Sequence, residues 1–103
     1  MDVTLLYFDE CPSWQIAAGH LEVLSRANPE IKVTRVIVDT PEAAVKQSFR
    51  GSPSIHVKGQ DLFADRDEPV GLACRIYQTP DGPAGSPTLE QLRDALQESS
   101  TDG

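Results

Sequence analysis

The chain has 103 residues, a formal charge of −7 and 39% hydrophobic residues. This length allows one domain with one core, and the composition is that of a globular protein, not a disordered one. An acidic surface repels phosphate groups, so we expect neither nucleic acid nor a membrane surface as a partner. The first residues lack the basic start of a signal peptide, and no apolar stretch is long enough to span a bilayer. We therefore expect a cytoplasmic protein.

The first half of the chain predicts a β-α-β unit. An apolar, β-prone run at 3–8 predicts a buried strand, and β-branched residues at 31–38 predict a second strand. Between them, Pro12 and a stripe of apolar side chains predict a helix that ends before Asn28-Pro29. Such a unit makes the two strands parallel, with a right-handed crossover.

The second half predicts a short helix, two further strands and a last helix. Thr40-Pro41 begins the short helix, and Gly51 stands where a C-terminal glycine belongs. Alternating residues at 54–58 predict a third strand, and 72–79 holds the fourth. We expect these two strands to form an antiparallel hairpin around an acidic, solvated loop that contains Asp61.

The last helix begins at 86–88, and its apolar face is formed by three leucines. We expect residues 99–103 to be a disordered tail, which leaves 1–98 as the domain. The predicted fold class is α/β, with a four-stranded mixed sheet in the order 2-1-3-4 and helices on both faces.

Cys11 lies between the first predicted strand and the first predicted helix. Ligands bind at this corner of an open α/β sheet, and a helix N-terminus stabilises a thiolate and lowers its pKa. The neighbouring Asp9 and Glu10 act in the opposite direction, since like charge raises the pKa of a thiol. The functional interpretation is a nucleophilic thiolate, and the structural one is a small buried hydrophobic residue.

The segments around Cys11 and Pro53 resemble the thioredoxin/glutaredoxin superfamily. The resemblance consists of Cys11-Pro12-Ser13-Trp14 at the start of a helix and Gly51-Ser52-Pro53-Ser54 at the start of the third strand. The segments YFDECPSW, FRGSPSI and GLACRIY are also similar to small bacterial thioredoxin-like proteins, some of them catalogued as selenoproteins or labelled alkylmercury lyase.

The resemblance implies a thioredoxin-like fold and roles for several residues. Cys11 would be the attacking thiolate, and Ser13 could donate a hydrogen bond to its sulfur. The Ser52–Pro53 peptide bond would be cis, and Ser52 would offer its backbone N–H and C=O to a peptide or to glutathione. Pro12, Trp14, Ser52 and Pro53 would form the substrate-binding site.

Trp14 stands where a dithiol enzyme of this superfamily has its second cysteine. A Cys-x-x-Trp site cannot form the local disulfide that releases a bound substrate. What remains is single-thiol chemistry, either glutathione-linked exchange or peroxide reduction through a sulfenic acid, and both need a resolving thiol from elsewhere. Trp14 itself fits either a core position or a wall of the active site.

Cys74 is the only other thiol. In the predicted hairpin it pairs near Val57, which puts it some 13 Å from the active-site edge. A disulfide needs Cα atoms within about 7 Å, so this arrangement makes Cys74 a buried structural cysteine. Alternatively, the long segment 59–74 folds back over Cys11 and makes Cys74 the resolving thiol.

Two hypotheses of function follow. The first is a thiol oxidoreductase that acts on a small thiol, disulfide or peroxide, or on a redox partner protein. It would have no tightly bound cofactor, and glutathione or another low-molecular-weight thiol would donate electrons. The second is a non-catalytic module that binds a partner, a metal ion or an organomercurial through a thiolate. His20, His56 and the two cysteines do not have metal-site spacing, so no metal ligands are assigned.

Overall fold

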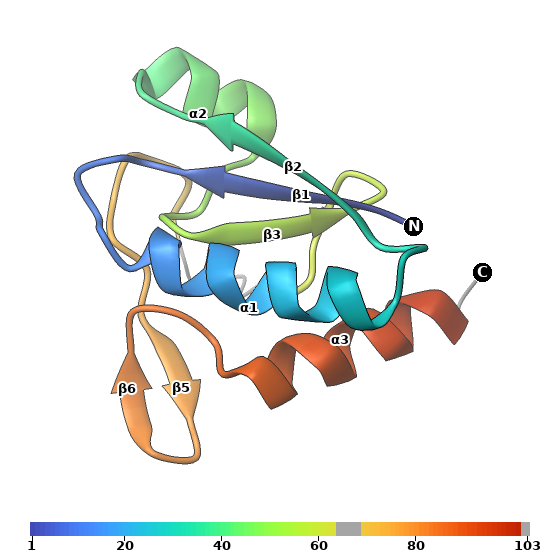
Figure 1. Cartoon of the computed structure of the whole chain (residues 1–103). Coiled ribbons are helices and arrows are strands. Elements are labelled where there is room, and N and C mark those ends of the chain that lie inside the picture. The colour runs from blue at the N-terminus through green and yellow to red at the C-terminus, as the bar shows by residue number, and fades with distance from the viewer. Residues whose placement is uncertain (64–68, 102–103) are drawn as a thin grey trace.

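The computed structural model describes residues 1–63 and 69–101 (Figure 1). The helices and strands follow in the order β1 (Asp2–Tyr7), α1 (Trp14–Ala27), β2 (Lys32–Ile37), α2 (Pro41–Gln47), β3 (Ser54–Val57), β4 (Gln60–Asp61), β5 (Tyr77–Thr79), β6 (Gly82–Ala84) and α3 (Leu89–Thr101). None of the described helices is long and apolar enough to cross a membrane.

Strands β1 to β4 form a four-stranded mixed sheet in the order β2-β1-β3-β4. Strand β1 runs parallel to β2, with Val3 opposite Val33, and antiparallel to β3, with Val3 opposite Val57. The predicted fold class and the parallel β-α-β unit are therefore confirmed. The topology is compatible with a thioredoxin-like fold.

Helices cover both faces of this sheet (Figure 1). Helices α1 and α3 pack on one face, in a cluster of buried side chains that includes Leu5, Leu21, Ile55 and Leu92. Helix α2 packs on the other face through a smaller cluster formed by Leu6, Val38, Ala44 and Phe49. The alternation of Leu5 and Leu6 along β1 supplies one side chain to each cluster, as a strand buried on both faces requires.

The fourth strand of the sheet is not the predicted one. Strand β4 follows β3 after two residues, Lys58 (φ 55°) and Gly59 (φ 76°). Positive φ at both central residues gives a turn whose twist matches that of a tight hairpin. Residues 77–79 instead pair with 82–84 in a separate two-stranded sheet. The expected hairpin between 54–58 and 72–79 is wrong, because the short connection supplies the partner of β3.

The observed helix ends match those predicted from the sequence at some positions and differ from them at others. Thr40 caps α2 by accepting a hydrogen bond from the Ala43 N–H, as predicted. The left-handed residue at the end of α2 is Ser48 (φ 53°), not Gly51. At Gly51 (φ 112°) a Cβ would lie 3.0 Å from the Cβ of Arg75, so this glycine is required by a close approach of two segments.

Helix α3 begins with reciprocal hydrogen bonds between Thr88 and Gln91, which is a capping box. The helix continues to Thr101, into the segment expected as a tail, and residues 102–103 lie outside the described residues. Most of the predicted acidic loop, residues 64–68, also lies outside them.

Candidate active site

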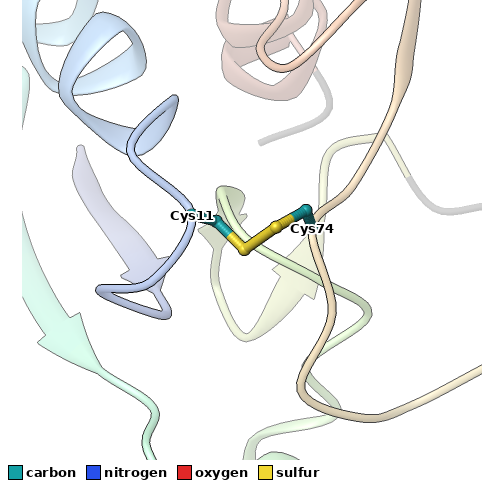
Figure 2. Close-up of a disulfide and its surroundings, with 2 residues drawn as sticks. All are labelled: Cys11 and Cys74. Atoms are coloured by element: carbon teal, nitrogen blue, oxygen red, sulfur yellow. A yellow bond between two sulfur atoms is a disulfide. The ribbon is translucent and has the colours of Figure 1, made fainter.

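Cys11 and Cys74 form a disulfide bond (Figure 2). Their Cα atoms are 5.5 Å apart although the residues are separated by 63 positions in the sequence. The estimate of some 13 Å between Cys74 and the site is therefore wrong. The prediction that Cys74 is buried is also wrong, because Cys74 is exposed to solvent, while its structural role stays a prediction.

Three backbone hydrogen bonds bring Cys74 to this place. The Gly71 N–H donates to Phe49 O (3.0 Å), the Ser52 N–H to Ala73 O (2.8 Å) and the Arg75 N–H to Ser52 O (3.0 Å). Segment 71–75 therefore runs alongside 49–52, with a parallel bridge between Ser52 and Cys74. The chain folds back toward Cys11, as the alternative interpretation of segment 59–74 required.

Cys11 lies in the turn between β1 and α1, as the sequence predicts (Figure 2). Its backbone N–H donates to Phe8 O at 3.0 Å, and its C=O accepts from the Trp14 N–H at 3.4 Å at the start of α1. Only 2% of the residue is exposed. The two cysteines of the disulfide thus differ in exposure, since Cys11 is buried and Cys74 is exposed.

The Ser52–Pro53 peptide bond is cis, which confirms the prediction. Both backbone hydrogen-bonding groups of Ser52 are engaged by segment 73–75, and Pro53 O accepts a hydrogen bond from the Tyr77 hydroxyl. The backbone groups that the resemblance assigns to a peptide or to glutathione are therefore occupied by the chain itself.

A buried ion pair fixes the same segment to the sheet. Arg75 Nη1 lies 2.7 Å from Asp61 Oδ2, and the two side chains are 1% and 6% exposed. Arg75 also donates to Ser54 Oγ (3.3 Å) and to Phe63 O, and its guanidinium lies 4.9 Å from the centre of the Tyr77 ring. The expectation that Asp61 belongs to a solvated loop is wrong, because β4 brings it beneath segment 73–75.

His56 belongs to this buried polar cluster. It pairs with Asp61 across β3 and β4. Burial is the main effect on its pKa and lowers it, Asp61 raises the pKa and Arg75 lowers it further, and the net direction is downward. The neutral imidazole is therefore favoured. Among the described residues no group of three or more His, Cys, Asp or Glu side chains could hold a metal ion, and none of these residues is assigned as a ligand.

Trp14 is the first residue of α1 and Ser13 precedes it. The sequence left the roles of both side chains undecided. Trp14 packs against the core cluster of α1 and stacks on Tyr7, with ring centroids 4.3 Å apart. Arg35 on β2 lies 5.8 Å from the centre of the Trp14 ring. The Ser13 hydroxyl makes no capping hydrogen bond to α1. Its hydrogen bond to a Cys11 thiolate stays a prediction for the reduced protein.

The connector after β6 packs against the same corner. A Cβ on Gly85 would lie 2.7 Å from the Cβ of Ser13 and would overlap its hydroxyl, so the two backbones approach closely. Pro12, between Cys11 and Ser13, is exposed. Its role in substrate binding stays a prediction.

Four residues of this site were not predicted from the sequence: Asp61, Arg75, Tyr77 and Gly85. The sequence does show that Arg75 follows the second cysteine, and an arginine buried at that place requires a carboxylate partner. The partner itself could not be chosen among the many acidic residues. Comparisons of the chain with known protein families, curated proteins and solved structures find no match.

Proposed function

We propose that the protein is a thiol oxidoreductase in which Cys11 and Cys74 cycle between a dithiol and a disulfide. The observation that carries the proposal is the disulfide that joins Cys11, which lies between the end of β1 and the start of α1, to Cys74. Reactive groups are commonly found at this corner of an open α/β sheet. The cis Ser52–Pro53 bond and the sheet order agree with a thioredoxin-like arrangement.

Cys74 supplies the resolving thiol that the Cys-Pro-Ser-Trp segment lacks. With a peroxide as oxidant, the Cys11 thiolate attacks one oxygen, the O–O bond breaks, and a sulfenic acid and an alcohol or water form. The Cys74 thiol then attacks the Cys11 sulfur, and the disulfide forms with loss of water. With a disulfide as oxidant, Cys11 forms a mixed disulfide and Cys74 displaces the second thiolate.

Small substrates fit this site better than extended peptides. An added strand needs free backbone N–H and C=O groups. At Ser52 both groups are bonded to segment 73–75, which the buried Arg75–Asp61 pair also holds. The proposed oxidants are therefore a peroxide or a low-molecular-weight disulfide, and the proposed reductant is glutathione or a similar thiol.

A cytoplasmic location agrees with this proposal if the disulfide is a stage of a catalytic cycle. Cytosolic thiols are kept reduced, and the disulfides that form there are mostly transient, catalytic or redox-sensing.

The second candidate function is a non-catalytic module in which the disulfide only holds segment 73–75 in place. The hydrogen bonds of Arg75 and Ser52 favour this candidate, because they hold segment 73–75 firmly in the fold. Reduced, such a module could bind a metal ion or an organomercurial through its two thiols.

Redox titration separates the two candidates. The protein is equilibrated in buffers of fixed thiol–disulfide potential, the thiols are alkylated, and the oxidised fraction is measured by mass. Structural disulfides have potentials below about −300 mV, and dithiol oxidoreductases lie at about −270 to −120 mV. We expect a value in the second range and turnover of peroxide or glutathione disulfide that is lost in Cys11→Ser and in Cys74→Ser. A potential below −300 mV without turnover would overturn the proposal.

A further inference from the structure

The two sulfurs of the disulfide differ in what can reach them. A thiolate that reduces a disulfide attacks one sulfur and expels the other, so access to each sulfur decides the direction of the reaction. In the disulfide state only 2% of Cys11 is exposed, so a reductant has little access to this residue. Cys74 is exposed.

Two segments border the corner that holds Cys11. On one side, the turn from β1 is fixed by the bond from the Cys11 N–H to Phe8 O. On the other, the connector after β6 brings Gly85 against Ser13 so closely that a Cβ has no room.

Cys74 is held at the surface by both of its neighbours. The Ala73 C=O and the Arg75 N–H are bonded to Ser52, which fixes the backbone on each side of Cys74. The Arg75 side chain is buried in its ion pair with Asp61, so this part of the chain cannot turn over to bury Cys74.

We infer that the reductant attacks the sulfur of Cys74, and not that of Cys11. The S–S bond breaks, the incoming sulfur forms a mixed disulfide with Cys74, and the electron pair of the broken bond leaves on Cys11 as a thiolate. Cys11 is also the better leaving group, because its sulfur lies at the N-terminal end of α1, where the helix dipole stabilises negative charge.

The inference divides the cycle between two residues, and its physiological meaning rests on the proposed function. Cys11 reacts with the oxidant in the dithiol state, and Cys74 receives electrons in the disulfide state. Cys74 is then a second catalytic residue that carries the reductant, in addition to resolving the oxidised Cys11.

Sulfite tests which sulfur is attacked. It cleaves a disulfide in one step, leaving an S-sulfonate on the attacked sulfur and a thiolate on the other. The oxidised wild-type protein is treated with sulfite while iodoacetamide traps the released thiolate, and peptides are identified by mass. We expect the S-sulfonate on Cys74 and the carbamidomethyl group on Cys11, in at least a tenfold excess over the reverse pattern. The same protein unfolded in urea is the control, in which both cysteines should be attacked to a similar extent.

S-sulfonate found mainly on Cys11, or equally on both cysteines of the folded protein, would overturn the inference. A repeat with glutathione and an acid quench tests the proposed class of reductant, with glutathionylated Cys74 expected. The experiment needs no oxidant and no turnover. If sulfite selects Cys74 in a protein that reduces no peroxide or disulfide, the inference stands and the proposed function fails.

Discussion

At the scale of single residues, His56 combines burial with two charged neighbours. Burial and Arg75 lower its pKa, and the opposing effect of Asp61 is smaller than their sum. A histidine with a lowered pKa in the folded state binds fewer protons there than in the unfolded chain. It therefore favours folding at a pH above its unfolded value near 6.5, and this contribution is lost as the pH falls through the folded pKa.

We predict that the free energy of unfolding rises between pH 5 and pH 7, with a contribution from His56 of at most about 1.4 kcal/mol per pH unit. In His56→Gln this contribution should disappear. Denaturant titrations at several pH values measure it, and His20→Gln, which leaves His56 in place, is the matched control. An equal pH dependence in His56→Gln and the wild type would contradict the assignment.

Gly85 is the second residue at which a substitution should change the stability of the protein. In Gly85→Ala the new Cβ meets the Ser13 Cβ at 2.7 Å, so the connector or the turn of Cys11 has to move. Overpacking of this kind costs about 1–3 kcal/mol. We expect that loss in a denaturant titration, together with a larger share of sulfite attack on Cys11. Gly71→Ala is the control, because no heavy atom lies within 4 Å of a Cβ there. Unchanged stability and unchanged sulfite selectivity in Gly85→Ala would show that Gly85 does not enclose Cys11.

At the scale of elements, the sequence predicts those parts of the fold that depend on neighbouring residues. The parallel β1 and β2, the helix between them and the Thr40 cap follow from local patterns of apolar, capping and proline residues. The place of Cys11 between β1 and α1 also follows from these local patterns, whereas the cis bond before Pro53 is implied by the resemblance alone.

The pairing of residues 60–61 and 71–79 could not be predicted in this way. Alternation at 72–79 fits a strand in any sheet, and nothing local distinguishes pairing with β3 from pairing with residues 82–84. The short β4 takes the edge of β3 because two residues suffice for the turn. Segment 73–75 then reaches Ser52 through contacts between residues more than twenty positions apart.

The link between β4 and segment 73–75 is the Arg75–Asp61 ion pair. Removing one partner leaves a buried charge uncompensated, which costs about 3–5 kcal/mol. We predict such a loss in Asp61→Asn, measured on the reduced protein by denaturant titration. The matched control is Glu22→Gln, which breaks the exposed pair with Arg26 and should change stability by less than about 1 kcal/mol.

Asp61→Asn should also weaken the disulfide. When segment 73–75 is held less firmly, the Cys74 thiol spends less time near Cys11, and the effective concentration of one thiol at the other falls. The equilibrium constant for disulfide formation against glutathione should therefore decrease in Asp61→Asn and stay unchanged in Glu22→Gln. An unchanged constant in both variants would mean that the ion pair does not position Cys74.

At the scale of the whole molecule, the disulfide joins the first turn after β1 to the segment that follows β4 (Figure 2). The closed loop contains α1, β2, α2, β3 and β4, so the redox state affects more than half of the unfolded chain. In the chain-entropy model, closing a loop with a sequence separation of 63 stabilises the folded state by about 4 kcal/mol.

We predict that the oxidised protein is more stable than the reduced protein by about 2–4 kcal/mol, because strain and residual structure in the unfolded chain usually reduce the ideal value. Denaturant titrations with and without a reductant give the difference. Cys11→Ser combined with Cys74→Ser is the matched control, and its stability should not respond to the reductant. The same difference should equal RT times the natural logarithm of the ratio of effective thiol concentrations in the folded and unfolded chains, since the two measurements close a thermodynamic cycle. Equal stability of the oxidised and reduced proteins would mean that the disulfide strains the fold as much as it constrains the unfolded chain.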